Sequence, residues 1–140
     1  MFSQRIKTVM ERKKLLVAPP DTSVSQAAKL MAKKNVGAVM VVENERLVGI
    51  FTERDVVFRV IAKERDTQTT SLADVMTPEP QTSNPEQTFG SALMTMHENG
   101  FRHMPVIENG KVVGIVSARN ALDPEMEDFV AEAQRRKHIR

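Results

Sequence analysis

The sequence predicts an α+β protein in which two similar β-α-β-β-α units pack sheet against sheet, followed by a C-terminal helix. Two observations predict this fold. A shift of sixty-five residues aligns the stretch 21–120 with itself, without a gap through its central part, and GIFTERD at 49–55 returns as GIVSARN at 114–120. A unit of about sixty residues cannot bury both faces of a three-stranded sheet, whereas two packed units can.

The first unit begins with a helix. Thr22 or Ser23 can cap its first turn, and apolar side chains then recur at helical spacing. The inward residues of this helix are Val24, Ala27, Ala28 and Met31, with Leu30 beside them. A strand at 38–42, a turn at 43–45 and a strand at 47–51 follow. A second helix begins near Glu53, and its apolar positions are Val56, Val57, Val60 and Ile61.

The second unit repeats this order. It has a helix over 89–98, a strand over 103–107, a turn at 108–110, a strand over 112–116 and a helix from Ala118. Asn109-Gly110 suits a tight hairpin because both residues tolerate a positive φ. A short apolar lead-in precedes each body: the residues Ile6, Val9 and Met10 match Leu72, Val75 and Met76. Prolines mark the irregular segments between lead-in and helix.

The predicted boundaries are 5–66 for the first repeat, 67–71 for a linker, 72–123 for the second repeat and 124–140 for a terminal helix. Pro124 fits the first turn of that helix, acidic residues follow it and basic residues end it, which suits the helix dipole. One face of this helix carries Met126, Phe129, Val130 and Ala133. We expect this face to dock on the two repeats or on a second subunit.

Composition excludes several classes of protein. There is no Cys, so disulfides, thiolate zinc sites and cysteine nucleophiles are excluded. The longest apolar run, 36–42, is too short to span a bilayer, and the N-terminal segment lacks the apolar region of a signal peptide. We therefore expect a cytoplasmic protein without a membrane segment. The net charge is +2 and acidic residues alternate with basic ones, which argues against a nucleic-acid partner.

The repeated motif has two interpretations. Thr52 is a good N-cap, and Asp55 three residues later completes a near match to a capping box, while Ser117 and Asn120 form a poorer one. Alternatively, the free N–H groups at this helix start attract a phosphate, the Thr52 hydroxyl donates to it, and the Asp55 carboxylate accepts from a ribose diol. Ile50 can then pack on a base. The spacing alone favours the helix cap.

The repeated units resemble a pair of CBS domains, a family named from cystathionine β-synthase. The matching segments are VMERKKLLVAPPDTSVSQAAKLM, VGAVMVVENERLVGIFTERD, DVMTPEPQTSNPEQTFGSALMTM and FRHMPVIENGKVVGIVSARN. Each unit ends in glycine, two apolar residues, Thr or Ser, two further residues, and Asp or Asn. The resemblance covers about residues 5–122. The chain looks like the small stand-alone bacterial proteins that consist of one CBS pair.

The resemblance implies a cleft between the units that binds an adenosine compound. The expected ligand is AMP, ADP or ATP, and the family's ligands also include NAD(H) and S-adenosylmethionine. No cofactor is required. Carried over by position, Asp55 would hold the ribose hydroxyls, Thr52 would contact phosphate and Ile50 would line the adenine slot.

Further site residues follow from the same resemblance. Val17 and Ala18 would flank the base. The segment Arg102–Pro105 of the opposite unit would add phosphate contacts, and Arg54 and Arg119 would add charge. The complete set of implied nucleotide-binding residues is Val17, Ala18, Ile50, Thr52, Arg54, Asp55, Arg102, His103, Met104, Pro105, Ser117, Arg119 and Asn120.

The two expected clefts differ in their residues. The second motif ends in Asn120, and a neutral amide makes weaker hydrogen bonds than a carboxylate does. The basic pair Arg102 and His103 serves one cleft, because the first unit has Gly37-Ala38 at the matching positions. Both differences favour the Asp55 cleft for a phosphorylated ligand. We expect the other cleft to bind adenosine more weakly or to take a different ligand.

The remaining motifs indicate neither a metal site nor an enzyme. His97 and His103 bridge a helix end and a strand and have no convergent third ligand, and no nucleophile-base set or P-loop is present. We therefore expect a regulatory sensor of adenosine nucleotides that acts on a partner such as an enzyme or a transporter. The alternative is a dimerisation scaffold in which both motifs are only helix caps. A homodimer, in the four-unit disc common among CBS pairs, is expected in either case.

Overall fold

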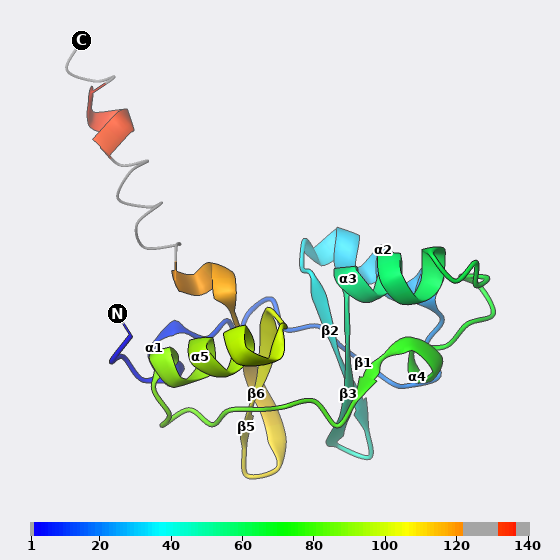
Figure 1. The fold of residues 1–140 in the computed structure, drawn as a ribbon, viewed down its shortest axis with the longest axis horizontal. Helices are drawn as coiled ribbons and strands as arrows, with labels where there is room; N and C mark the ends of the chain where they lie inside the picture. The colour runs from blue at the N-terminus through cyan, green and yellow to red at the C-terminus, as the bar shows by residue number, and fades with distance from the viewer. Residues whose placement is uncertain (1, 122–131, 137–140) are drawn as a thin grey trace.

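The computed structural model describes residues 2–121 and 132–136. Two β-sheets lie side by side, with helices on their outer faces (Figure 1). The elements of the first half are α1 (Ile6–Val9), β1 (Val17–Ala18), α2 (Val24–Lys34), β2 (Ala38–Glu43), β3 (Arg46–Thr52), α3 (Glu53–Asp55) and the π-helix η1 (Val56–Ile61). Those of the second half are α4 (Leu72–Val75), β4 (Thr77–Pro78), α5 (Phe89–Asn99), β5 (His103–Glu108), β6 (Lys111–Ser117) and the 3-10 helix η2 (Ala118–Ala121).

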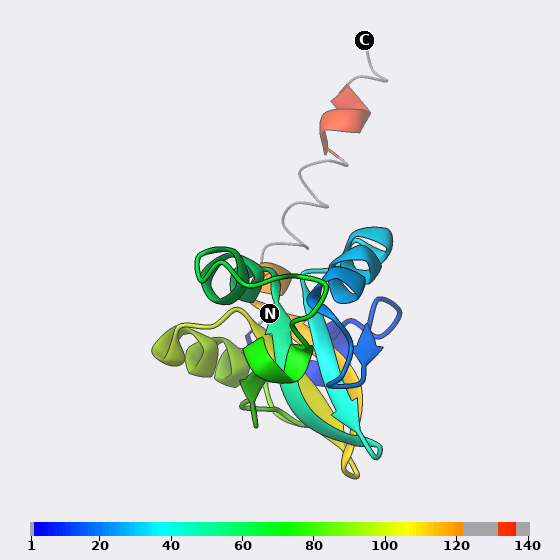
Figure 2. The same cartoon turned by 90° about the vertical axis from the view of Figure 1, so that its right-hand side faces the viewer.

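The two sheets share one layout. The first has the strand order β1-β2-β3-β4, in which β1 runs parallel to β2 and the other neighbours are antiparallel. The second has the hairpin β5-β6, flanked by Ser83 paired with Val106 and by Glu11 paired with Ile115. These single bridges stand where β1 and β4 stand in the first sheet. Both hairpins point the same way (Figure 2). The predicted pair of similar α+β units is therefore confirmed.

The lead-ins are exchanged between the repeats. Ile6 and Met10, at the start of the chain, are buried with Phe89 of the second repeat. Leu72, which opens the second half, is buried in the core around Phe51 of the first repeat. In Figure 1, α1 lies beside α5, whereas α4 lies beside β3. The boundaries 5–66 and 72–123 stay predictions, and in space each lead-in packs against the body of the other repeat.

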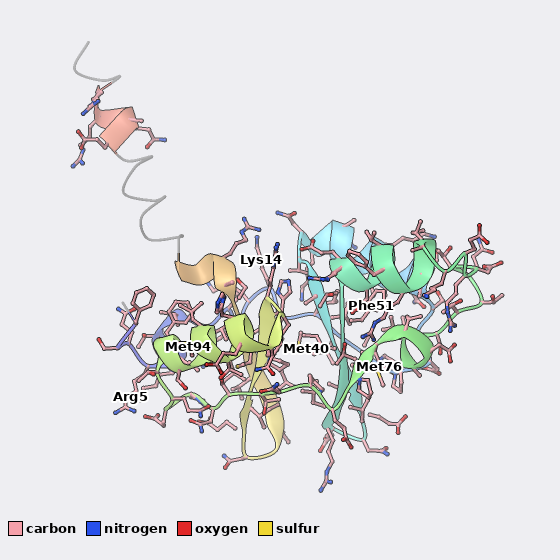
Figure 3. The ribbon with its side chains drawn as sticks, viewed as in Figure 1. Arg5, Lys14, Met40, Phe51, Met76 and Met94 are labelled. Atoms are coloured by element: carbon pink, nitrogen blue, oxygen red, sulfur yellow. The ribbon has the colours of Figure 1, made fainter. Side chains whose placement is uncertain are left out.

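Two methionines cover the motif glycines in this exchange. A Cβ added to Gly49 would collide with the side chain of Met76, and one added to Gly114 would lie 2.7 Å from the Sδ of Met10. Figure 3 labels Met76 beside β3. Glycine is thus present in both copies of the motif because the opposite lead-in approaches the strand too closely for a side chain.

The sheets are buried on both faces because the inner faces pack together. Ala38, Met40 and Ile50 of the first sheet form a cluster with Val112 and Ile115 of the second. Met40 is labelled between the two sheets in Figure 3. The opposite face of the first sheet packs against the helices. Its buried residues include Val39 and Val41 of β2 and Phe51 of β3. Alternation along a strand thus provides one face for each layer, as the predicted sheet-to-sheet packing requires.

The helix after the first motif differs from its prediction. Val60 is fully buried and Val56 is partly buried against the core, but Val57 and Ile61 are 55% and 59% exposed. The segment is π-helical, and only one side of its apolar stripe, the side with Val60 and Val56, is covered by the core. Phe58 is also 58% exposed. This helix therefore presents an apolar surface, formed by Val57, Phe58 and Ile61, to its surroundings.

The hairpin turn and the linker are ordered. Asn109 and Gly110 have φ values of 53° and 78°, as predicted for a tight hairpin. In the predicted linker, Thr67 and Thr70 accept backbone hydrogen bonds from Ser25 and Val24, at the start of α2. The linker therefore packs on the first repeat.

The predicted C-terminal helix is described only over residues 132–136, which are helical and exposed. Met126, Phe129 and Val130 lie outside the described residues, so the docking of that helix stays a prediction. Among the described residues, no helix combines the length and the hydropathy needed to cross a bilayer.

Gly49→Ala should lower the free energy of unfolding by about 1–3 kcal/mol, because the new methyl group displaces the side chain of Met76. Met76→Ala alone removes a partly buried side chain and also destabilises. The double variant should be more stable than the sum of the two single effects predicts, because truncation makes room for the methyl group. Urea unfolding of the four proteins measures this coupling. Additive costs would show that Met76 and Gly49 are not in contact.

Candidate functional site

The first motif forms the predicted helix cap. The Asp55 backbone N–H donates to the Thr52 hydroxyl (3.4 Å), while the Thr52 N–H (2.8 Å) and its hydroxyl (3.2 Å) both donate to Oδ2 of Asp55. This reciprocal arrangement is a capping box. Asp55 is only 8% exposed. Its carboxylate is thus held in one orientation at the end of β3.

The second carboxylate oxygen connects the motif to the opposite lead-in. Oδ1 of Asp55 pairs with Nε of Arg59 at 3.4 Å, and Nη1 of Arg59 donates to the carbonyls of Val75 (3.3 Å) and Met76 (2.9 Å). An ionised carboxylate accepts about four hydrogen bonds. Asp55 receives three contacts, two at Oδ2 and one at Oδ1, so acceptor capacity is left at Oδ1. Arg59 did not stand out in the sequence, because its role depends on the exchanged lead-in.

Two of the residues expected to line a base lie in one row across the sheet. Val17 pairs with Met40, and Met40 pairs with Ile50, so their side chains share the face between the sheets. Val17 is 47% exposed at the edge of the row, while Ile50 is 6% exposed. Val17 therefore provides the accessible apolar surface of the row, and Ile50 is buried behind it. Ala18 is not part of this row, because it pairs with Val41 and is buried with it in the core under the helices, on the opposite face of the sheet.

The start of β5 brings the second repeat to the first motif. His103 is partly buried, and this burial lowers its pKa from the ordinary value of 6.5. The nearby carboxylate of Glu53 raises this pKa, whereas the positive charges of Arg102 and Arg119 lower it. The imidazole thus lies within electrostatic range of the motifs of both repeats. Two further predicted residues are buried on opposite faces of β5. Met104 lies in the second core, whereas Pro105 pairs with Ile115 on the face toward the first sheet.

The other predicted residues are placed as follows. The guanidinium of Arg54 lies 5.0 Å from the ring centroid of Phe58, on the exposed side of η1. Arg119 is exposed, and Ser117 is half-buried at the end of β6. Asn120 lies in η2, but its side chain lies outside the described part of the structure. The predicted weakness of the Asn120 cleft therefore stays a prediction.

Metal ligands do not gather in the described residues. Over 2–121 and 132–136, no group of three or more His, Cys, Asp or Glu side chains is placed to hold a metal ion. Near the first motif, the pKa of His103 responds to Glu53 of the first repeat and to two arginines of the second. Such a mixed set is suited to an anionic or polar ligand rather than to a cation.

The lowered pKa of His103 makes stability depend on pH. As the pH falls through about 6.5, His103 takes a proton in the unfolded chain before it does so in the folded protein. The free energy of unfolding should therefore fall on acidification through this window, until the lowered pKa of the folded state is reached. His103→Gln should reduce this loss, and His97→Gln, at an exposed helix position, should not. Urea titrations at several pH values measure it, and equal acid sensitivity of the two variants would contradict the assignment.

Proteins of similar sequence include CBS-domain proteins from several organisms. CBS domain-containing protein YhcV of Bacillus subtilis is 36% identical over 112 residues, covering 80% of this chain and 79% of YhcV. CBSCBSPB1 of Arabidopsis thaliana is 34% identical over 127 residues, which are 90% of this chain. The chain spans only 23% of the length of that plant protein.

Solved structures share the fold. An uncharacterized conserved protein from Pyrococcus horikoshii superposes with a TM-score of 0.82 at 32% identity, covering 89% of this chain and 94% of that one. PAE2072 of Pyrobaculum aerophilum, solved in complex with AMP, has a TM-score of 0.76 at 24% identity and covers 84% and 89% of the two chains. The CBS pair of MJ0100, solved with 5-methylthioadenosine and S-adenosyl-L-methionine, has a TM-score of 0.79 at 21% identity and covers 89% and 98%.

The family itself is matched twice along the chain. Residues 6–62 and 72–124 each correspond to one CBS domain. These two stretches include both copies of the glycine motif and both exchanged lead-ins. The chain therefore belongs to the CBS domain family and carries two CBS domains in tandem.

Proposed function

We propose that this protein is a regulatory module that binds an adenosine compound between its two repeats. The observation that carries the proposal is the Asp55 carboxylate, which is buried, fixed by Thr52 and left with acceptor capacity at Oδ1. It lies two residues from Glu53, whose charge acts on His103 of the other repeat. A ribose diol at Asp55 would thus have groups of both repeats within reach.

The predicted residues contact three parts of the ligand, which are the ribose, the base and the phosphate. The ribose hydroxyls donate to Asp55. The base lies along the exposed edge formed by Val17, with Ile50 behind it, and Ala18 can contact the base only through its backbone. The phosphate contacts Arg102 and His103, which approach the motif from the second repeat. The Thr52 hydroxyl donates its single proton to Asp55, so the phosphate contact expected of it requires that hydrogen bond to be exchanged.

The ligands of related structures support this class of compound. AMP in PAE2072 and the two sulfur-containing adenosine derivatives in MJ0100 share the adenosine part. AMP, ADP, ATP, NAD(H) and S-adenosylmethionine all contain it. We propose that the module signals to a partner, an enzyme or a transporter, by a change of conformation, and performs no catalysis itself. The cytoplasmic location expected from the sequence stays a prediction.

Asp55→Asn should weaken AMP binding about ten- to a hundredfold, since a hydrogen bond to a charged group contributes about 1.5–3 kcal/mol. Asp66→Asn is the control, because the Asp66 carboxylate accepts from the backbone N–H groups of Gln68 and Thr69 in the linker and, within the described part of the chain, has no contact with the groups around Asp55. It should leave the affinity within about a factor of two, as additivity of separate sites predicts. Isothermal titration calorimetry measures both affinities.

The AMP affinities of the two variants show whether Asp55 binds the ligand or only caps the helix. If Asp55→Asn binds AMP as the wild type does, Asp55 is a cap and not a ribose ligand. If the wild type binds none of AMP, ADP, ATP, NAD(H) and S-adenosylmethionine, the regulatory proposal is wrong. The scaffold function would then be favoured.

A second candidate function, a dimerisation scaffold, has one observation in its favour. Val57, Phe58 and Ile61 form an exposed apolar surface on η1, each more than half exposed. Exposed apolar patches on small proteins mark interaction surfaces. We propose that this surface is part of a homodimer interface, which is compatible with ligand binding as well.

Ile61→Asp should convert the homodimer into monomers, because it places a charge in the apolar surface. Phe2→Asp serves as the control, since Phe2 is 60% exposed near the N-terminus and lies outside this surface. Light scattering after gel filtration gives the mass of each protein. A monomeric wild type, or an Ile61→Asp protein that remains dimeric, would contradict the assignment.

A further inference from the structure

Arg59, on η1, is shared between two groups of acceptors. Its Nη1 donates to the carbonyls of Val75 (3.3 Å) and Met76 (2.9 Å), at the end of α4, and its Nε lies 3.4 Å from Oδ1 of Asp55. An N–H···O hydrogen bond is usually about 2.7–3.2 Å long. The bond to Met76 lies in this range, whereas the contact with Asp55 is longer. The guanidinium is therefore held mainly by α4, and Asp55 receives its weaker contact.

The attachment of α4 to the first repeat depends on such contacts. α4 is a single turn over Leu72–Val75, and one helical turn is not stable in water by itself. The Leu72 N–H donates to the carbonyl of Thr22 at 2.9 Å, and the side chains of Leu72 and Val75 are buried in the first core. The last carbonyls of a helix have no partner within the helix, and Arg59 donates to two at this end. Arg59 is thus one of the groups that hold α4 in place.

The partner of Arg59 would change if α4 moved away. A guanidinium that no other acceptor holds pairs with a carboxylate through two parallel hydrogen bonds. Arg59 lies four residues after Asp55 on the same helical segment, so it can turn fully onto Oδ1. Oδ2 already accepts from the N–H and the hydroxyl of Thr52. A ribose hydroxyl would then have to displace the arginine, whereas with α4 docked Oδ1 keeps its acceptor capacity.

We propose that Arg59 couples the docking of α4 to ligand binding at Asp55, because α4 holds the arginine back from the carboxylate. This inference rests on the proposed function. The form with α4 docked then binds an adenosine compound more tightly than the undocked form does. Since such coupling is reciprocal, the bound compound stabilises the docking of α4 by the same factor. α4 and the adjoining β4 lie between the bodies of the two repeats in the chain, so the segment that responds to the ligand is the one that connects them.

The second repeat has a different residue at the arginine position. Pro124 stands there, sixty-five residues after Arg59, and a proline ring has no N–H to donate. The lead-in that packs on the second repeat is α1, and it matches α4 in structure. The Met10 N–H closes α1 with a hydrogen bond of 2.8 Å, and the Met76 N–H closes α4 with one of the same length. The Met10 amide is therefore an internal control for the Met76 amide.

Hydrogen exchange of these two amides, with and without ligand, measures the coupling. The ligand is the one of AMP, ADP, ATP, NAD(H) and S-adenosylmethionine that the wild type binds most tightly, at saturation. Exchange passes through the undocked form, even where that form is too rare to change the affinity. The ligand should raise the protection of Met76 by about fivefold or more over its effect on Met10, which is the size of an ordinary allosteric coupling.

Two variants show whether Arg59 carries the effect. In Arg59→Met, compared at the same occupancy, the ligand should protect both amides equally, because the competitor for Oδ1 is gone. Arg65→Met removes an exposed arginine just after η1 and should behave as the wild type does. A merely structural Arg59 would change the protection of α4 without ligand, but not the gain that the ligand produces.

The outcomes distinguish this inference from the proposed function. Equal gains of Met10 and Met76 in the wild type would overturn the inference and leave the proposed function intact, and this comparison does not depend on the folding of any variant. A larger gain at Met76 that persists in Arg59→Met would do the same. Absence of binding by all five compounds would overturn both.

Discussion

The covering of each motif glycine by a methionine from the opposite lead-in is the contact on which the rest of the structure depends. Met76 lies on Gly49 and Met10 lies on Gly114, so neither strand edge is complete without the other half of the chain. Because Gly49 is only three residues from Thr52, this contact also fixes where β3 ends and the helix cap begins. The position of the candidate site is thus set by packing between the repeats.

The cap and the ligand site use different parts of one carboxylate. Oδ2 of Asp55 accepts from Thr52, while Oδ1 faces Arg59 and retains acceptor capacity. The two interpretations of the motif are therefore compatible. Arg59 extends the connection to the carbonyls of Val75 and Met76, which belong to the lead-in of the second repeat. A ligand at Asp55 would thus act on a group that is bonded to both halves of the chain, which suits a regulatory role.

The sequence predicted the layers and most element boundaries because these depend on local patterns. The strand predicted over 38–42 is found over Ala38–Glu43, and the helix predicted over 89–98 is found over Phe89–Asn99. The exchange of lead-ins could not be predicted, because the repeat has the same period whichever unit its lead-in covers. The exposure of Val57 and Ile61 could not be predicted either, because the apolar spacing does not show how much of the helix surface its neighbours cover.

Part of the site was equally hidden in the sequence. The cap formed by Thr52 and Asp55 follows from spacing, but the place of Glu53 depends on the space left by Gly37 in a distant strand. The only signal in the sequence was the exchange of residue types between the repeats, Gly37 and Glu53 in one against Arg102 and Ala118 in the other. Such an exchange has a physical meaning only when the structure shows that the two positions touch.

The exchanged lead-ins also determine the order in which the chain can fold during synthesis. Ile6 and Met10 are made well before β5 and β6, the strands that bury them. The pairing of Glu11 with Ile115 closes a loop that includes nearly all of the described chain, and contacts between such distant residues form slowly. The segment with Ile6 and Met10 therefore remains without its partner until β5 and β6 have been made. Its docking is the step that joins the two halves into one cooperative unit.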